Sequence, residues 1–199
     1  LVGGDTTKTA ADAPQVFSVT VMGAVPIGQA LRRDGLQTGD ELWVSGSLGD
    51  AAFAVNQRQP NLKLNWPQPR LGLGRALLNI AHAAIDISDG LQSEIRHVLT
   101  SSSMRSGVSS AFAAEMNWSA LPLGPTLSAA IALSKISQDD AVIRAITGGD
   151  EYELLFAAPA ACAEAIAAIG KSLKLPLTRI GRIVAADAPT IAWRDAEGM

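Results

Sequence analysis

The order of apolar and polar residues along the chain predicts strands that alternate with helices. Apolar and β-branched residues dominate 16–25, a run that ends before Pro26, which predicts a buried strand there. Shorter runs predict further strands at 41–45, 83–88, 108–113, 152–157, 177–184 and 190–194. Helical spacing predicts helices at 50–57, 70–82, 139–147 and 159–170, and from Leu91 onward through Ile95 and Leu99. This alternation indicates an α+β class: a layered, mixed β-sheet covered by helices.

Turn residues mark the boundaries of these elements. Gly46 to Asp50 is typical of a tight strand-to-helix turn, and it lacks the lysine of a P-loop. The stretch 57–69 contains three prolines, so it is expected to be a long loop, and long loops are often functional. Ser137 followed by Asp140 is typical of a helix start, and Gly148 is expected to end that helix.

Composition narrows the class of protein. The 199 residues are 48% hydrophobic and 18% charged, which predicts a folded core and excludes a disordered, solvating chain. A net charge of −3 provides no broad basic field, so neither nucleic acid nor a membrane surface is expected as a partner. No apolar run approaches the ~20 residues needed to span a bilayer. The single cysteine, Cys162, cannot form an internal disulfide, which suits a reducing cytoplasm.

Three short segments place acidic residues beside glycines or small residues: 3–7 (GGDTT), 86–90 (DISDG) and 147–151 (TGGDE). Mg²⁺ prefers oxygen ligands and keeps several waters, so a few carboxylates suffice when phosphates supply the remaining ligands. Asp5, Asp86 and Asp89 are candidates for that role.

The second segment combines several useful groups. Asp86 and Ser88 are expected on one face of a strand, and Asp89 is expected where the next helix begins and free N–H groups suit phosphate. In the alternative interpretation Asp89 is an ordinary helix cap paired with Gln92, and Asp86 is a surface acid. Both interpretations remain open from spacing alone.

Other candidates are equally undecided by chemistry. Gly148 and Gly149 can simply end a helix and leave Asp150 solvated. An arginine can clamp a phosphate, but Arg32 and Arg33 are equal candidates for that role. The two histidines and four tryptophans are too dispersed for a metal pair or a base-stacking platform, so structural roles are expected. No Ser-His-Asp triad can be assembled.

Seven motifs, read in order, carry a resemblance to a known family. They are LVGGDTT at 1, VPIGQALRRDG at 25, SGSLGDAA at 45, WPQPRLGLG at 66, AIDISDGL at 84, ITGGDEYELLF at 146 and RIGRI at 179. Together they resemble the thiamine-monophosphate kinase family of the aminoimidazole ribonucleotide synthetase-like superfamily. The form Asp-x-Ser-Asp-Gly-Leu at 86–91 is the discriminating motif, because aminoimidazole ribonucleotide synthetases carry a glycine-rich segment there.

The resemblance implies an enzyme, a transferase that uses ATP to phosphorylate thiamine monophosphate to thiamine diphosphate. Transfer would be direct and in line, with Mg²⁺ as cofactor and no covalent enzyme intermediate. Matched motif positions imply Mg²⁺ ligands at Asp5, Asp86 and Asp89, and ATP contacts at Gly4, Asp5, Arg33 and Ser88. Asp150 matches the acid that contacts the substrate. The resemblance therefore favours Arg33 over Arg32, a choice that side-chain chemistry alone does not make.

The resemblance also implies a domain organisation. Residues 1–25 are expected to be a residual strand of an N-terminal ATP-binding domain, and 26–199 the C-terminal α+β domain of the aminoimidazole ribonucleotide synthetase-like fold. The family's N-terminal acidic cluster and C-terminal aromatic residue are absent from these 199 residues, and the segment between Thr7 and Phe17 is longer than expected. The chain alone is therefore expected to be nearly inactive, and its full-length parent a cytoplasmic homodimer.

Two alternative functions remain. One is another ATP-using synthetase of the same superfamily, with a different phosphate or carbonyl substrate. The other is a non-catalytic nucleotide-binding module that keeps the fold.

Overall fold

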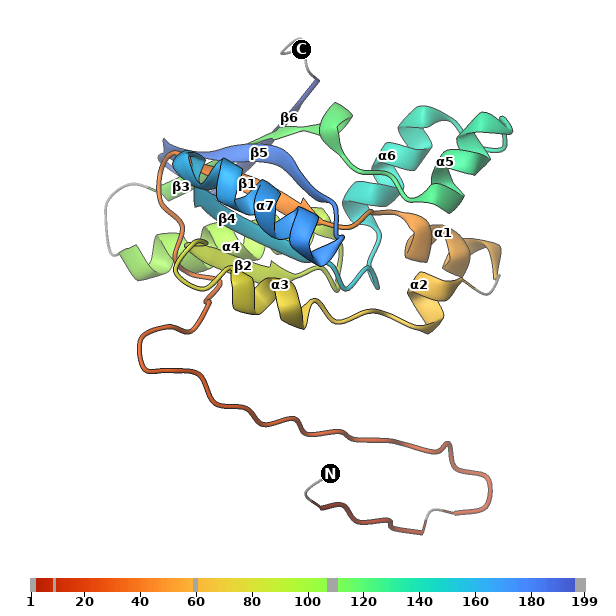
Figure 1. The fold of residues 1–199 in the computed structure, drawn as a ribbon. Helices are drawn as coiled ribbons and strands as arrows, with labels where there is room; N and C mark the ends of the chain where they lie inside the picture. The colour runs from red at the N-terminus through yellow and green to blue at the C-terminus, as the bar shows by residue number, and fades with distance from the viewer. Residues whose placement is uncertain (1–2, 9, 59–60, 107–110, 196–199) are drawn as a thin grey trace.

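A six-stranded mixed sheet forms the centre of the computed structural model, which describes residues 3–8, 10–58, 61–106 and 111–195 (Figure 1). The strand order across the sheet is β2 (Ala83–Asp86), β4 (Leu154–Pro159), β1 (Asp40–Ser45), β5 (Leu177–Ala186), β3 (Ala111–Asn117), β6 (Thr190–Arg194). Neighbouring strands are antiparallel except β3 and β6, which are parallel. The expected α+β class with a mixed sheet is confirmed.

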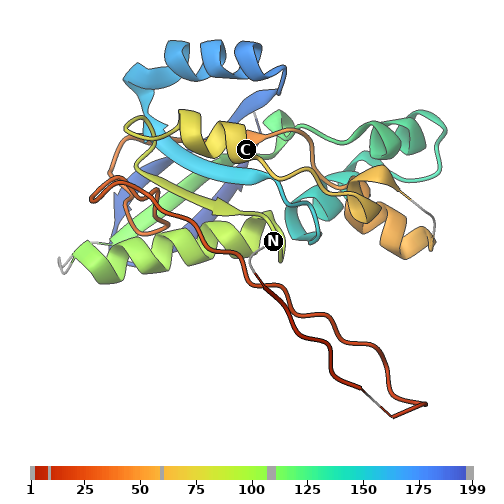
Figure 2. The same cartoon turned by 60° about the horizontal axis from the view of Figure 1, so that its bottom comes forward.

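Helices cover both faces of this sheet (Figure 2). The long helix α4 (Leu91–Ser106) packs on one face, and α3 (Leu71–Ala76) and α7 (Ala163–Leu173) lie on the other. Strand alternation divides the core accordingly, since Leu155 and Ala157 of β4 face α4 whereas Phe156 and Ala158 face α3 and α7.

A smaller helical group lies beyond one end of the sheet. It contains α1 (Asp50–Gln57), α2 (Leu62–Asn65), α5 (Pro125–Ala132) and α6 (Gln138–Thr147). Its own apolar cluster is formed by Phe53, Leu127, Ala130 and Ala141. Two short 3₁₀ turns, Trp118–Ala120 and Ala160–Cys162, connect the larger elements. The helical group matters for the site because the turns entering α1 and leaving α6 both reach the start of β4.

The predicted buried strand at 16–25 is wrong for this structure. The segment has no strand partner, and its apolar side chains are exposed, with Phe17 at 84% and Val21 at 87%. It runs away from the folded body (Figure 1). An apolar run becomes a buried strand only when a neighbouring edge accepts its hydrogen bonds and a second layer covers its side chains. The described part of the chain supplies neither.

Several helices and strands have bounds that differ from those predicted. The proline-rich stretch 57–69 contains the short helix α2 rather than loop alone, and α5 was not predicted. Helix α3 ends at Ala76 instead of 82 because the chain turns there and Asn79 has a left-handed φ of 63°. Pro159 ends β4 and also caps the 3₁₀ turn Ala160–Cys162, so α7 itself begins at Ala163 rather than at 159. Val108, expected in a strand, lies outside the described residues.

Other predictions are confirmed. Helix α1 has the predicted bounds, and Ser137 caps α6 by accepting a hydrogen bond from the Asp140 N–H at 3.0 Å. The turn before α1 is a tight strand-to-helix connection with Gly49 at φ 92°. Among the helices of the described residues, none combines the length and apolarity needed to cross a bilayer.

Candidate functional site

Two of the three acid-bearing segments lie side by side at the end of β2 and the start of β4. The Asp150 N–H donates to the Ser88 carbonyl and the Tyr152 N–H to the Ile87 carbonyl, both at 2.8 Å. The Ile87 N–H donates a hydrogen bond of 2.8 Å to the Glu153 backbone carbonyl. These three hydrogen bonds bring residues 86–90 and 148–153 together as one structural unit.

Glycines permit this close approach. Gly90 has a left-handed φ of 104°, and a Cβ there would lie 2.7 Å from the Thr147 carbonyl oxygen. A Cβ on Gly149 would lie 2.5 Å from the Ser88 carbonyl oxygen. Both distances are too short for a side chain, so these glycines are required where the two backbones meet.

A buried glutamate supports the turn that carries Ser88 and Asp89. Glu94, 3% exposed, accepts hydrogen bonds from the Asp89 N–H at 3.2 Å and from the Ser88 hydroxyl at 3.5 Å. Gln92, considered above as the partner of Asp89, instead accepts from the Trp193 indole N–H at 3.3 Å. Ser88 was predicted to lie on the face of strand β2. That strand ends at Asp86, so Ser88 lies beyond it and that prediction is wrong.

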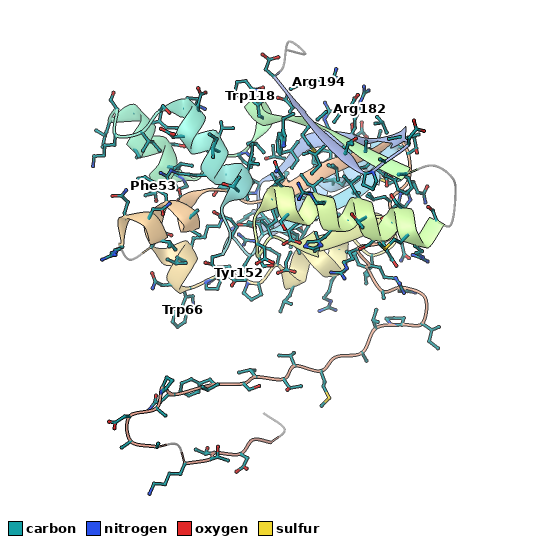
Figure 3. All side chains as sticks on the ribbon, turned by 180° about the vertical axis from the view of Figure 1, so that it is seen from behind. Phe53, Trp66, Trp118, Tyr152, Arg182 and Arg194 are labelled. Atoms are coloured by element: carbon teal, nitrogen blue, oxygen red, sulfur yellow. The ribbon has the colours of Figure 1, made fainter. Side chains whose placement is uncertain are left out.

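The exposed side of the unit is acidic. Asp86, Asp89 and Asp150 are all exposed, and the Tyr152 hydroxyl donates to Asp150 Oδ1 at 3.1 Å. The pKa of Tyr152 is raised, chiefly by this hydrogen bond and by the Asp150 charge, with further contributions from burial and from the charges of Asp86 and Asp89. Tyr152 lies at the end of the sheet that faces the α1–α2 group (Figure 3). Negative charge is therefore concentrated on this exposed side of the unit.

The other side of the same segment is buried and ion-paired. Glu153 is 2% exposed and accepts two hydrogen bonds from the Arg70 guanidinium, at 2.7 and 2.6 Å. The Ser45 hydroxyl donates to Glu153 at 2.6 Å, and the Lys63 ammonium lies 3.4 Å away. The pKa of Arg70 is raised, first by its hydrogen bond to Glu153. Glu153 is thus held by β1, α2 and the residue before α3.

Glu151 anchors the segment to the start of α1. It accepts from the Gly49 N–H at 2.7 Å and pairs with the Lys63 ammonium at 2.7 Å. Lys63 also donates to the Ser47 carbonyl. Burial raises the pKa of Glu151, against the opposing effect of the Lys63 charge. Residues 150–153 therefore alternate: Asp150 and Tyr152 face outward, while Glu151 and Glu153 are clamped inside.

A pocket of about 570 Å³ opens beside this ion-paired cluster. Its lining includes Lys63 and Trp66 from the proline-rich stretch, Arg70 directly after that stretch, and Lys174. Trp66 is 74% exposed. This part of the chain thus contributes to the site mainly through Lys63 and Arg70, the two cations that pair with Glu151 and Glu153.

The first acid-bearing segment does not join this site. Gly4 and Asp5 lie on the exposed N-terminal segment, where Asp5 accepts from the Thr6 N–H at 2.8 Å. Within the described ranges, no three His, Cys, Asp or Glu residues form a group that could hold a metal ion. The ligand set Asp5, Asp86 and Asp89 therefore stays a prediction.

The two candidate arginines differ in their surroundings. Arg32 donates two hydrogen bonds to Asp34, at 2.8 and 2.6 Å, and this pairing lowers the pKa of Asp34 to about 2. Arg33 is exposed on the surface of a shallow depression that includes Ser101. None of the three aspartates Asp86, Asp89 and Asp150 lines this depression, and the ATP contact assigned to Arg33 stays a prediction.

The histidine and tryptophan predictions are met in part. His82 lies just before β2 rather than on a helix, with Nδ1 2.8 Å from Asp40 Oδ1. Trp43 stacks on Phe156 with ring centroids 6.4 Å apart. Both contacts are structural, as expected.

Sequence reasoning missed the residues that hold the site together. Lys63, Arg70, Glu151, Glu153 and Tyr152 were given no role, although the last three fall within the quoted motif at 146–156. The available signal was the run of four consecutive residues with polar groups, DEYE, directly before an apolar strand. Successive side chains of an extended chain point to opposite sides, so half of such a run is expected to face the protein.

Comparisons with known proteins give related sequences. No family model matches the chain. The thiamine-monophosphate kinase of Haemophilus influenzae is 34% identical over 198 residues, covering 92% of this chain and 54% of the relative. That of Escherichia coli K12 is 31% identical over 210 residues, covering 99% of this chain and 59% of the relative. The chain thus spans a little more than half the length of these curated relatives.

Solved structures give the same fold. The thiamine-monophosphate kinase of Stenotrophomonas maltophilia K279a is 38% identical, with a TM-score of 0.72 over 84% of this chain and 54% of that one. AaThiL, solved with AMPPCP and TMP, is 24% identical with a TM-score of 0.63, over 84% of this chain and 52% of that one. The hydrogenase maturation protein HypE of E. coli, 20% identical over 89% and 52%, shares the fold with a TM-score of 0.67. The layered α+β domain is therefore of the expected aminoimidazole ribonucleotide synthetase-like type, and the chain belongs to the thiamine-monophosphate kinase family.

Proposed function

We propose that this chain carries part of the active site of an enzyme that transfers a phosphoryl group from ATP to thiamine monophosphate, giving thiamine diphosphate. The observation that supports this most directly is the hydrogen-bonded unit formed by 86–90 and 148–153, which gathers three exposed aspartates at one end of the sheet. The name of the curated relatives supports the reaction. The AMPPCP and TMP complex of AaThiL supports a nucleotide and a thiamine phosphate as the two ligands.

Mg²⁺ is proposed as the cofactor at Asp86 and Asp89. Both are exposed carboxylates, and their charges contribute to the raised pKa of Tyr152, so negative charge accumulates at this surface. A set of oxygen donors with waters and phosphate oxygens is the environment that Mg²⁺ prefers. When bound, the ion would neutralise phosphate charge. Asp5 would be the third ligand, supplied by the N-terminal segment.

The remaining groups would position the two substrates. Ser88 and the N-terminal segment with Gly4 and Asp5 are proposed to contact ATP, together with Arg33. Asp150 is proposed to face thiamine monophosphate, whose thiazolium ring is cationic and whose amino group is a hydrogen-bond donor. In-line transfer to a phosphate oxygen of the substrate requires positioning and charge neutralisation, and no covalent intermediate on the protein.

The proposed catalytic unit is larger than these 199 residues. Exposed apolar side chains between Val16 and Ile27 support a strand that pairs with a preceding N-terminal domain, so that 1–25 belongs to that domain and 26–199 is the C-terminal domain. The share of the relatives' length that is matched supports the same division. We expect the full-length parent to be a cytoplasmic homodimer and the present chain alone to be inactive or nearly so.

The test is a coupled assay of ADP release by the full-length parent, with thiamine monophosphate as substrate and free thiamine as control. Turnover should require Mg²⁺ and thiamine monophosphate, and Asp86→Asn or Asp89→Asn should reduce it by more than tenfold. Asp139→Asn, on an exposed first turn of α6, is the matched control and should have no effect. Equal turnover of free thiamine would overturn the substrate assignment. Intact activity in both aspartate variants would overturn the metal assignment and favour a non-catalytic role for this surface.

A further inference from the structure

Tyr152 occupies an unusual backbone position between two clamped glutamates. Its φ is 51°, and that of Asp150 is 61°, both in the left-handed region that residues other than glycine rarely adopt. Glu151 and Glu153 on either side are 2% exposed and ion-paired. Strained backbone persists where surrounding contacts enforce it, and such positions are concentrated at functional sites.

The clamp determines where the Tyr152 side chain lies. The Tyr152 N–H is bound to the Ile87 carbonyl, so the residue is fixed relative to the turn that carries Asp86 and Asp89. Its hydroxyl donates to Asp150 Oδ1 at 3.1 Å. A carboxylate has two oxygens, and a hydrogen bond to one of them fixes the rotation of the group and directs the other outward.

We propose that Tyr152 is a positioning residue for Asp150, whose carboxylate it orients toward the substrate through the Oη–Oδ1 hydrogen bond. The proposal rests on the proposed function, because Asp150 is assigned there to thiamine monophosphate. Removal of the hydroxyl leaves the Asp150 charge in place but releases its orientation. The effect is therefore expected in substrate affinity rather than in folding, since Tyr152 is 40% exposed.

The chain's single tyrosine gives a direct test of the contact. Absorbance of tyrosinate is followed during alkaline titration of the 199-residue chain. The midpoint should lie above the ordinary tyrosine pKa of 10.0, and Asp150→Asn should lower it, because a neighbouring negative charge disfavours tyrosinate. Asp139→Asn, remote from Tyr152, should leave the midpoint unchanged. An identical midpoint in wild type and Asp150→Asn would overturn the proposal.

A kinetic cycle in the full-length parent tests the positioning role. Tyr152→Phe should raise KM for thiamine monophosphate about tenfold, the effect of one charge-assisted hydrogen bond, and leave KM for ATP unchanged. In the Asp150→Ala background, which lacks the accepting oxygen, the same change should have no further effect. A full loss in that background, or no loss in wild type, would overturn the proposal. Absence of thiamine-monophosphate kinase activity in the wild-type parent would instead refute the proposed function and with it the substrate role of Asp150.

Discussion

Replacement of Arg70 tests whether the buried ion pair with Glu153 holds the site together. Arg70→Ala removes two charge-assisted hydrogen bonds, of 2.7 and 2.6 Å, from a carboxylate that is 2% exposed. Loss of one partner from a buried pair costs about 3–5 kcal/mol. The Arg70 side chain is 25% exposed, and the Ser45 hydroxyl and Lys63 ammonium remain near Glu153, so we expect roughly 2–3 kcal/mol. At ~2–4 °C per kcal/mol, Tm should fall by roughly 4–12 °C.

Urea and thermal unfolding followed by circular dichroism measure this loss. Arg182→Ala is the matched control, because Arg182 pairs with Glu115 at 2.7 Å but the two side chains are 68% and 29% exposed, and it should cost less than ~1 kcal/mol. Adding Glu153→Gln to Arg70→Ala should restore part of the stability, since the neutral amide leaves no unpaired buried charge. Equal losses in Arg70→Ala and Arg182→Ala would refute the view that the buried pair anchors residues 150–153.

Four further substitutions give separate tests of the same fold. Gly90→Ala should destabilise by about 2 kcal/mol or more in urea unfolding, because φ is 104° and a Cβ would meet the Thr147 carbonyl at 2.7 Å. Gly74→Ala, with nothing within 4 Å in α3, should instead stabilise by ~0.5–1 kcal/mol, and a loss comparable to that of Gly90→Ala would contradict the steric explanation. Ser137→Ala should cost ~1 kcal/mol through the lost cap of α6, and no change in Tm would contradict the role of that cap. Burial raises the pKa of Glu151 above 4.5 in the folded state. Between pH 4.5 and the raised pKa the folded state therefore binds more protons than the unfolded state, so the free energy of unfolding falls as pH rises through this range. Relative to wild type, Glu151→Gln should therefore gain stability as pH rises from 4.5, and a relative loss over that range would refute the direction.

The elements that the sequence predicted well are those with local causes. Helix α1 follows a tight glycine turn, and α6 starts at a serine cap, so both were placed within one residue. Strands β1, β5 and β6 carry apolar residues between turn signals and appear close to where they were expected. The start of β4 was misplaced by two residues because Asp150 and Tyr152 adopt left-handed backbone, which depends on partners far away in the sequence.

The candidate site shows the same division. Motifs identified Asp86, Ser88, Asp89 and Asp150 as chemistry-bearing residues, and their carboxylates and hydroxyl are intrinsic to the sequence. The sequence did not show that these residues lie close together, because their proximity results from backbone hydrogen bonds between residues more than 60 positions apart. Spacing likewise could not predict the buried ion pairs of the site, because a charged residue in a sequence is equally compatible with a side chain exposed to solvent. The residues concerned are Lys63, Arg70, Glu151 and Glu153.

The sequence by itself therefore determined the α+β class, most element types and the family of the chain, because apolar periodicity, caps and collinear motifs are local properties. Only the tertiary structure decided that 86–90 and 148–153 form one unit, that alternate residues of 150–153 are clamped and exposed, and that 16–25 lies without a partner. Burial and ion pairing depend on which segments meet across the sheet, and that is a property of the packed chain rather than of any one segment.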